Sequence, residues 1–482
     1  MAIALANISE SGEAPQARVK DAKSLFKIYE EVAKADSNAA HNRAQVRLLR
    51  NGEPPFDQEK REEAGVGWMS NFNSGTAAAD LEQAQTGYVG LANAVPTLIE
   101  VRTKYGDPAK RKGWCGIIAE QFDWLMKRRW RSFDTNKQKT TLGFISNGLS
   151  VVYWPHDVDW RYEVGQLGQF LFPKDADVDV SKLEIAFQVE SFAPSKLFKQ
   201  LKHQEKISAN GDSTDINRDA MISAIRDANA EGNSSGWGMT ELEAAFAGND
   251  LGQDCGFSQQ VKVVHAYVKE FSEKVSHYMI RADGKGEDFL SVRREAFPCM
   301  SKFMVFYSDG VGEGKLADLR GFLQKGFESY IAADEVLNGM RDSAMLSLKP
   351  LMKGNNTALG SEMSAETTIS AFVIPPPGVT FEPMPISAGN AELALAFRAE
   401  MQRLGANNTG GYQSHAVSPE GGERTLGEVQ LQAQNNAQIS DAKYGNYYQS
   451  EGQVNDNTFF RIISPRYTSA DPGYSERMEF FE

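Results

Sequence analysis

The stretch WPHDVDW at residues 154–160 is the nearest approach to a catalytic cluster in the sequence. It collects His156, Asp157 and Asp159 between two tryptophans. A histidine beside a carboxylate can act as a general base. Because no nucleophile or glycine elbow accompanies these residues, a structural loop is the preferred interpretation, and an enzyme site is the alternative.

Two other stretches approach binding loops but fail on spacing. In YSDGVGEGKL (307–316), Asp309 and Leu316 stand where a phosphate loop requires glycine and serine or threonine. In DADVDVSKLE (175–184), a calcium loop beginning at Asp175 would require glycine at its sixth position and glutamate at its twelfth, but Val180 and Ala186 stand there. We therefore expect a turn before a helix and a solvated acidic turn, with no catalytic site, cofactor or metal.

The histidines and one cationic stretch complete the candidates. None of the six histidines has a second His or Cys at zinc spacing. His265 and His277 could meet as a cross-strand pair in a hairpin. KRRWRSF (127–133) interleaves cations with aromatics, as nucleic-acid contacts do. Its three arginines, Arg128, Arg129 and Arg131, could instead lie on the polar face of a helix or meet acidic residues of a neighbouring subunit. Because the chain is acidic, the contact with a neighbouring subunit is favoured.

The composition restricts the class of protein. The 482 residues carry 51 basic and 64 acidic side chains, a net charge of −13, which argues against tight DNA binding. Mean hydropathy is −0.44. The sequence shows no run of apolar residues long enough to span a membrane and no secretion signal. Cys115, Cys255 and Cys299 are too far apart for a disulfide framework and fit a reducing compartment.

The residue periodicity predicts a helix-rich α+β protein. In the first part, helices are expected at 16–49, 76–104 and 114–133 and a polar excursion at 203–256, with a helical piece at 215–230. Strands are expected at 148–154, 169–173 and 182–192, and a β-hairpin at 261–271 and 274–282. In the second part, an apolar seam predicts a helix over 315–349 that Pro350 ends. Then follow an irregular segment with a strand at 369–374, a helix at 391–405 and a loop at 406–422.

The last predicted helix, running toward residue 463, poses a question. Thr425 followed by Glu428 is a capping-box signature. Yet the helix carries a thin apolar stripe among Gln, Asn and Glu, and Gly445 and Gly452 are expected to kink it. A helix that buries so little in its own subunit suggests packing against other copies. The stripe consists of Leu426, Val429, Ala433 and Ala437.

The order of these elements resembles the portal proteins, or head-to-tail connectors, of tailed bacteriophages. Arg424-Thr425-Leu426-Gly427-Glu428-Val429 is similar to an Arg-Thr-x-x-Glu-Val pattern at the corresponding helix start, and IPPPGVTFEPMPI (374–386) is similar to the segment that joins clip to stem in connectors of short-tailed phages. RNGEPPF (50–56) and the helices near it also fit the resemblance to portal proteins. The order of elements resembles that of portal proteins over most of the chain. The sequence motifs that carry the resemblance are short.

The resemblance implies a domain plan. Residues 1–314 would form the wing, with its mixed α/β part at 141–300. Residues 315–350 and 389–405 would be the stem helices, 351–388 the clip, 406–422 the tunnel loop, and 423–463 a long kinked helix. Residues 464–482 would be a crown remnant or C-terminal tail, shorter than the crown of many portals.

The resemblance also implies partners and a place. Portals form rings, typically of twelve subunits, at one capsid vertex of the virion, are assembled in the bacterial cytoplasm, and conduct double-stranded DNA. Expected partners are the major capsid protein, tail adaptor and terminase, with a scaffold protein as a further candidate; no membrane is involved. Another head or tail ring is the alternative. The loop 406–422 has no Lys or Arg, so it would touch DNA weakly through Asn407, Asn408, Gln413, Ser414 and His415.

Overall fold

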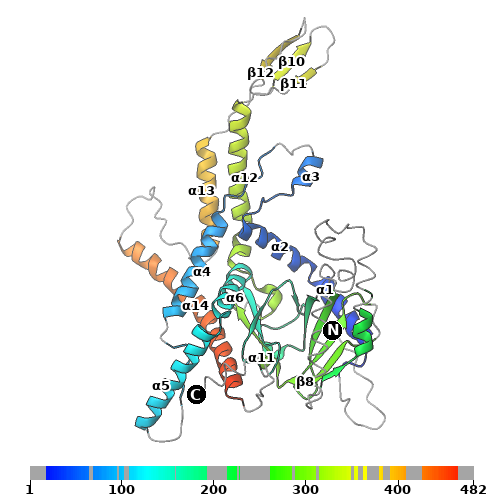
Figure 1. The fold of residues 1–482 in the computed structure, drawn as a ribbon. Coiled ribbons are helices and arrows are strands. Elements are labelled where there is room, and N and C mark those ends of the chain that lie inside the picture. Colours follow the sequence, from blue (N-terminus) through cyan, green and yellow to red (C-terminus); the bar gives the residue numbers. More distant parts are fainter. Residues whose placement is uncertain are drawn as a thin grey trace, which may run out of the picture. The chain divides into compact units, whose positions relative to one another are not determined.

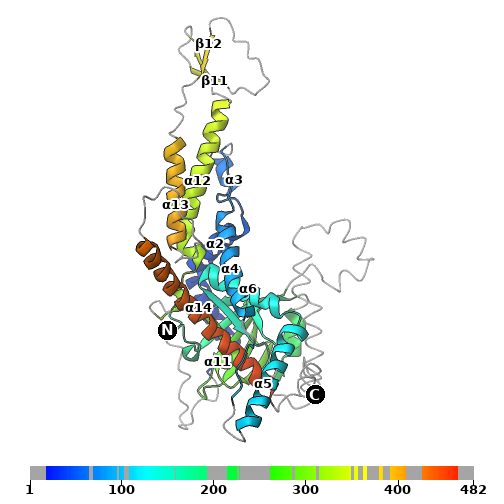
Figure 2. The ribbon, with the colours of Figure 1, turned by 90° about the vertical axis from the view of Figure 1, so that its left-hand side faces the viewer.

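The computed structural model describes most of the chain, in two compact units (Figures 1 and 2). Unit 1 comprises residues 1–43, 88–320 and 443–482, and unit 2 comprises 44–87 and 321–442. The residues described are 18–64, 69–94, 97–102, 108–157, 159–192, 214–224, 227, 261–284, 288–310, 314–348, 352–356, 362–365, 379–383, 391–408 and 426–464.

Unit 1 is built on two antiparallel sheets. The larger has the order β3-β4-β6-β7-β8-β5, and the smaller the order β2-β1-β9. The strands of the larger sheet are β3 (Phe170–Leu171), β4 (Ile185–Phe192), β5 (Thr214–Ile216), β6 (Val261–Lys269), β7 (Val275–Arg281) and β8 (Ser291–Phe297). Those of the smaller are β1 (Leu149–Tyr153), β2 (Glu163–Gly165) and β9 (Met304–Ser308).

Helices of unit 1 cover these sheets. Helix α1 (Ala22–Ala35) packs Leu25 and Val32 against Phe187 and Val264 of the larger sheet, whose other face packs on the smaller sheet. This alternation along β4 and β6 is the period of two that a doubly buried strand requires. Other helical segments of unit 1 include α5 (Pro108–Trp124), a π turn (Leu125–Arg129), α6 (Phe133–Asn147), a helical piece at 218–224, α11 (Met300–Phe303) and 3-10 turns at Val180–Lys182 and Leu316–Asp318.

Unit 2 is a helical hairpin with a small sheet inserted in its connection. Helices α12 (Phe322–Leu348) and α13 (Ala391–Asn408) lie side by side (Figures 1 and 2). Between them in the chain, β10 (Met352–Asn356), β11 (Glu362–Ala365) and β12 (Val379–Pro383) form an antiparallel sheet of order β11-β10-β12. Helix α3 (Gln58–Glu63) also belongs to unit 2, whereas three helices contribute to both units: α2 (Ser37–Asn51), α4 (Thr76–Ala94) and α14 (Leu426–Ile462).

The helix-rich α+β class predicted from the sequence is confirmed, as is the hairpin of β6 and β7. Helix α2 ends at Asn51, two residues beyond the predicted end at residue 49, and α12 ends at Leu348, before Pro350. The acidic turn at 175–184 and the turns at Gly310 and Gly314, both with positive φ, also follow expectation.

Several boundaries predicted from the sequence are wrong. The helix expected at 16–49 is two helices, and the one expected at 114–133 gives way to a π turn after Trp124. A helix, α6, runs on to Asn147 and ends at Gly148, whose φ of +76° allows β1 to begin at once. Strands β8 and β9 were missed. Helix α12 starts at Phe322, because the preceding Leu316 and Leu319 are buried in the core of unit 1.

Candidate functional site

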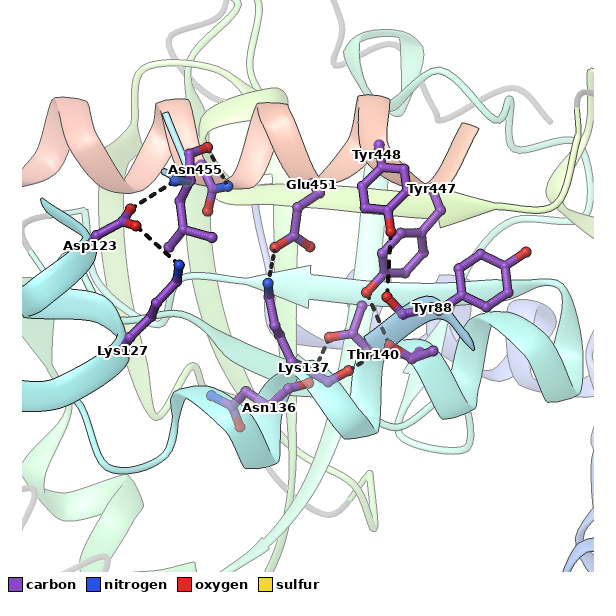
Figure 3. Close-up of polar contacts among 12 residues, drawn as sticks. Tyr88, Asp123, Lys127, Asn136, Lys137, Thr140, Tyr447, Tyr448, Glu451 and Asn455 are labelled. Carbon is purple, nitrogen blue, oxygen red and sulfur yellow. Dashed lines mark hydrogen bonds and ion pairs between the residues drawn. The ribbon is translucent and has the colours of Figure 1, made fainter. Parts of the chain in front are cut away.

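The C-terminal half of α14 carries a buried polar cluster in unit 1. Glu451 lies 3.1 Å from Lys137 of α6, and the hydroxyl of Tyr307 donates to the same carboxylate at 2.8 Å. One turn earlier, the hydroxyls of Tyr447 and Thr141 share a hydrogen bond of 3.0 Å. Figure 3 shows that Lys137 and Glu451 point toward each other from the two helices. We call these five residues the polar cluster.

Burial gives the polar cluster its energetic weight. The side chains of Lys137 and Glu451 are 4% and 9% exposed. An ion pair so removed from water contributes little net, but removing one partner strands the other charge at a penalty of about 3–5 kcal/mol. Burial, followed by the nearby Glu451 carboxylate, raises the pKa of Tyr307 and of Tyr447, so both remain neutral donors.

Arg461 extends the buried polar surface of α14 to the end of the helix. Its guanidinium lies 4.4 Å from the ring centroid of Trp154 and donates to the carbonyl of Lys302. Burial lowers the pKa of Arg461 to about 10, against the opposing effect of Asp157 and Asp159. Two further anchors are provided by Asn455, which donates to Leu98 O at 3.3 Å, and Asn457, which donates to Ser301 O at 3.0 Å.

These contacts correct one expectation about this helix. The polar residues of α14 were expected to depend on neighbouring copies, but Tyr447, Glu451 and Asn457 have partners within their own chain. The helix continues as one element through Gly445 and Gly452. The side chains of the thin stripe at 426–437, and that of Glu428, lie outside the described residues, as does Thr425; the helix begins at Leu426, as the cap signal predicts.

A groove of about 700 Å³ runs along the other side of α14 in unit 1. Its floor includes buried apolar side chains of β9 and the acidic turn, Met304, Phe306 and Val180. Asp177, Asp179 and Asp456 line it with amides of α14. Lys182 pairs with Asp177 at 2.9 Å, and Lys302 binds Asn457 at 2.6 Å. The groove can therefore receive an apolar anchor with a cationic flank.

The described residues of the candidate catalytic stretch, 154–157 and 159–160, form a loop in unit 1. Asp159 is 13% exposed and accepts hydrogen bonds from both the backbone N–H and Nε of Arg161, at 3.0 and 3.3 Å. Burial raises the pKa of Asp159, and Arg161 opposes that effect. His156 is exposed and its Nδ1 lies 3.5 Å from Arg293. Asp159 thus has a structural contact, and the enzyme hypothesis gains no support from this geometry.

The predicted meeting of His265 and His277 is confirmed. Nδ1 of His265 lies 2.9 Å from Nε2 of His277, and the rings stack with centroids 5.1 Å apart. His277 also stacks on Tyr267 at 4.7 Å. Burial lowers the pKa of His277 well below its usual value, and His265, Arg293 and His156 act in the same direction. His277 is therefore neutral at physiological pH.

Unit 2 contains a second buried polar feature, on α12. The backbone N–H groups of Ser70, Phe72 and Ser74 donate to side chains spaced four residues apart, in reverse order: Asp342 at 2.8 Å, Asn338 at 3.0 Å and Asp334 at 3.2 Å. Two residues of extended chain advance about 6.6 Å and four residues of helix about 6.0 Å, so the two spacings match. We call this arrangement the backbone ladder.

The distal part of the helical hairpin leaves apolar side chains exposed. In α12, Met345 is 47% exposed, and in α13 Leu395 and Phe397 are 50% and 47% exposed. The predicted apolar seam of α12 is buried at Leu323, Tyr330 and Ala333, but the buried positions beyond Ala333 are the three polar residues of the backbone ladder. The hairpin therefore presents more apolar surface than its own two helices cover.

The remaining predicted site residues are separated. Arg128 and Arg129 end the π turn and Arg131 follows it, all three exposed, rather than on a continuous helix. Asn407 and Asn408 are the last two residues of α13, not part of a loop. The other tunnel-loop candidates lie outside the described residues, as does the strand expected at 369–374: Gln413, Ser414 and His415.

The residues of the polar cluster were not identified from the sequence, although a signal for a buried helix face was present. Tyr447, Glu451, Val454, Thr458 and Ile462 recur at intervals of three or four residues, which is the spacing of one helix face. All five are buried. Counting only apolar residues obscured the face, because two of its five members are polar.

Comparison with known proteins leaves the family open. No family model matches the chain, and no curated protein matches it either. Within the part of the chain that the structure describes, no helix is both long and apolar enough to cross a membrane. The same described residues contain no group of three or more His, Cys, Asp or Glu placed to hold a metal ion.

Proposed function

We propose that this chain is the subunit of a bacteriophage portal ring, through which double-stranded DNA is packaged into and ejected from a capsid. The observation that carries the proposal is the helical hairpin of unit 2. A long helix, a small antiparallel sheet and a returning helix follow one another, and then the polar α14, in the order of stem, clip, second stem and long helix that the sequence resemblance implies.

The exposed side chains of the hairpin support assembly. Met345, Leu395 and Phe397 are each about half exposed on the two packed helices α12 and α13. In a closed ring, neighbouring hairpins would bury them. The sheet β11-β10-β12 would then serve as the clip, where terminase and tail adaptor dock in turn. The capsid vertex of the virion, where the major capsid protein would surround the ring, is the proposed location.

Native mass spectrometry and negative-stain imaging of the purified protein test the ring. We expect a single closed assembly of about twelve subunits with a central hole. A chain that stays monomeric at high concentration, and is single in its native particle, would overturn the proposal.

A second experiment separates a portal from another head or tail ring. Deleting residues 409–421, which follow the last residue of α13, is expected to leave the ring intact and to impair DNA packaging or retention in a packaging assay. Normal packaging by the deletion variant would contradict the tunnel-loop assignment. Rings that take no part in packaging would favour another ring component.

A further inference from the structure

Helix α5 of unit 1 displays an apolar stripe toward solvent. Trp114, Ile117 and Trp124 are 66%, 51% and 42% exposed, and their spacing places them on one side of the helix. The opposite side of α5 is buried at Ala119 and Phe122, the latter in edge contact with Phe459 of α14. The helix is thus anchored by one side and leaves two tryptophans for a partner. Tryptophan and arginine are the commonest anchors of protein interfaces.

The stripe is flanked by positive charge. Exposed Arg128, Arg129 and Arg131 follow α5 directly. Residues 108–131 contain seven basic and two acidic side chains, whereas the whole chain has a net charge of −13. The rest of each copy is therefore strongly acidic, so another copy is an electrostatically favourable partner.

The groove beside α14 offers the complementary features. It combines the buried apolar floor at Met304 and Phe306 with carboxylates, and none of the residues that line it belongs to α5. Lys182 pairs with Asp177, and Ser181 donates to one oxygen of Asp179. The exposed carboxylates of Asp179 and Asp456 are the groups of the rim that an incoming guanidinium can meet. A floor for an indole ring and an acidic rim for arginine thus occur together on a second surface of unit 1.

We propose that the α5 stripe of one copy docks in the α14 groove of the next copy. The inference rests on the proposed ring and names its contact. Two different surfaces of one chain that fit each other make a heterologous interface, which closes into a ring when the rotation between copies permits. In this contact Trp114 or Trp124 fills the groove, and Arg128 and Arg131 meet its acidic rim.

Directed cross-linking tests the contact in the full-length chain. The background carries Cys115→Ser, Cys255→Ser and Cys299→Ser, with Ile117→Cys on the stripe and Gln453→Cys in the groove, both of which are exposed. Under mild oxidation the doubly substituted chain should give a series of cross-linked oligomers, from the dimer up to the full ring. A mixture of the two single variants should give dimers only, because each chain then has one thiol. Rings without cross-links would overturn the contact and leave the portal proposal standing. Cross-linked oligomers without closed rings would support the contact and contradict the portal proposal.

Charge reversal provides an independent test. Arg128→Glu with Arg131→Glu should raise the concentration for half-assembly at least tenfold, and adding Asp179→Arg with Asp456→Arg should restore assembly. Lys27→Glu, at an exposed position of α1, is the control and should leave assembly unchanged. Normal assembly of the variant with Arg128→Glu and Arg131→Glu would overturn the contact. If that variant assembles normally but loses binding to a labelled DNA duplex that the unaltered ring binds, the stripe is a nucleic-acid site instead.

Discussion

Helices α12 and α14 both bury polar side chains, but against different kinds of partner. The backbone ladder of α12 presents Asp334, Asn338 and Asp342 to the main chain of one extended segment. The polar cluster on α14 instead joins Glu451 to the side chains of Lys137 and Tyr307. A main-chain partner needs only an acceptor at the correct spacing, whereas a side-chain partner must also match in charge. The two regions should therefore differ in their sensitivity to substitution and to pH.

The largest effect is expected at the ion pair of the polar cluster. Lys137→Met strands the Glu451 carboxylate and should lower the free energy of unfolding by about 3–5 kcal/mol. Urea unfolding at fixed protein concentration measures it, since assembly also contributes to apparent stability. Adding Glu451→Gln, which can still accept from Tyr307, should recover more than half of the loss. A loss as large in the double variant would show that packing of the lysine stem, not charge, holds the helices together.

The backbone ladder should show an intermediate effect. Asn338 both accepts from Phe72 N and donates to Phe72 O, each at 3.0 Å. Asn338→Ala leaves these two main-chain groups without their partner and should lower the free energy of unfolding by about 1–3 kcal/mol. Glu335→Ala, exposed on the same helix, is the control and should change it by less than ~0.5 kcal/mol. Equal effects of the two substitutions would mean that the ladder contributes nothing.

Acid should weaken unit 1 through His277. Because the pKa of His277 is lowered in the folded chain, the unfolded chain takes up a proton first as pH falls. The stabilisation is fully present above the unfolded value of 6.5 and is lost progressively below it. Unfolding measured from pH 7 to pH 5 should show this decline, and His277→Gln should flatten it. An unchanged pH profile in the variant would remove His277 as its cause.

How far the sequence predicts this molecule depends on where the partners of a segment lie. The β6–β7 hairpin and its histidine contact are local, and the sequence indicated both. The polar cluster joins Lys137 to Glu451, more than three hundred residues apart, and no local pattern connects them. The backbone ladder is hidden for the same reason: residues 71–75 look like an ordinary Gly- and Asn-rich loop until α12 supplies the acceptors.

Strand β9 was missed for a different reason. MVFYS is short and is buried at four of its five positions, so it lacks the alternation that marks a half-exposed strand. Its assignment depends on pairing with β1, through which Val151 faces Phe306. The same limit applies to the groove, since its floor is formed by β9 and its rim by residues of the acidic turn and α14. Sequence reasoning could identify the acidic turn but not the surface it helps to form.

The smallest effect, and the sharpest contrast with unit 1, is expected at Asp334. Burial raises the pKa of this carboxyl, while its hydrogen bonds to Ser74 act in the opposite direction. Asp334→Asn keeps an acceptor for the Ser74 N–H and removes a buried charge. It should raise the free energy of unfolding at pH 7 by less than the ~1 kcal/mol of a typical hydrogen bond. As pH falls, folded wild-type Asp334 takes up its proton before the unfolded chain does, so the advantage of the variant should shrink.

Asp342→Asn provides the matched comparison for Asp334→Asn. Asp342 accepts from Ser70 N with both oxygens, at 2.8 and 3.1 Å, and an amide retains only one of them. This substitution should therefore lower the free energy of unfolding. Hydrogen exchange of the amides at residues 70 and 74 resolves the two effects within unit 2. If both variants lower stability equally at all pH values, the ladder depends on carboxylate charge after all, and the contrast drawn between the two helices would fail.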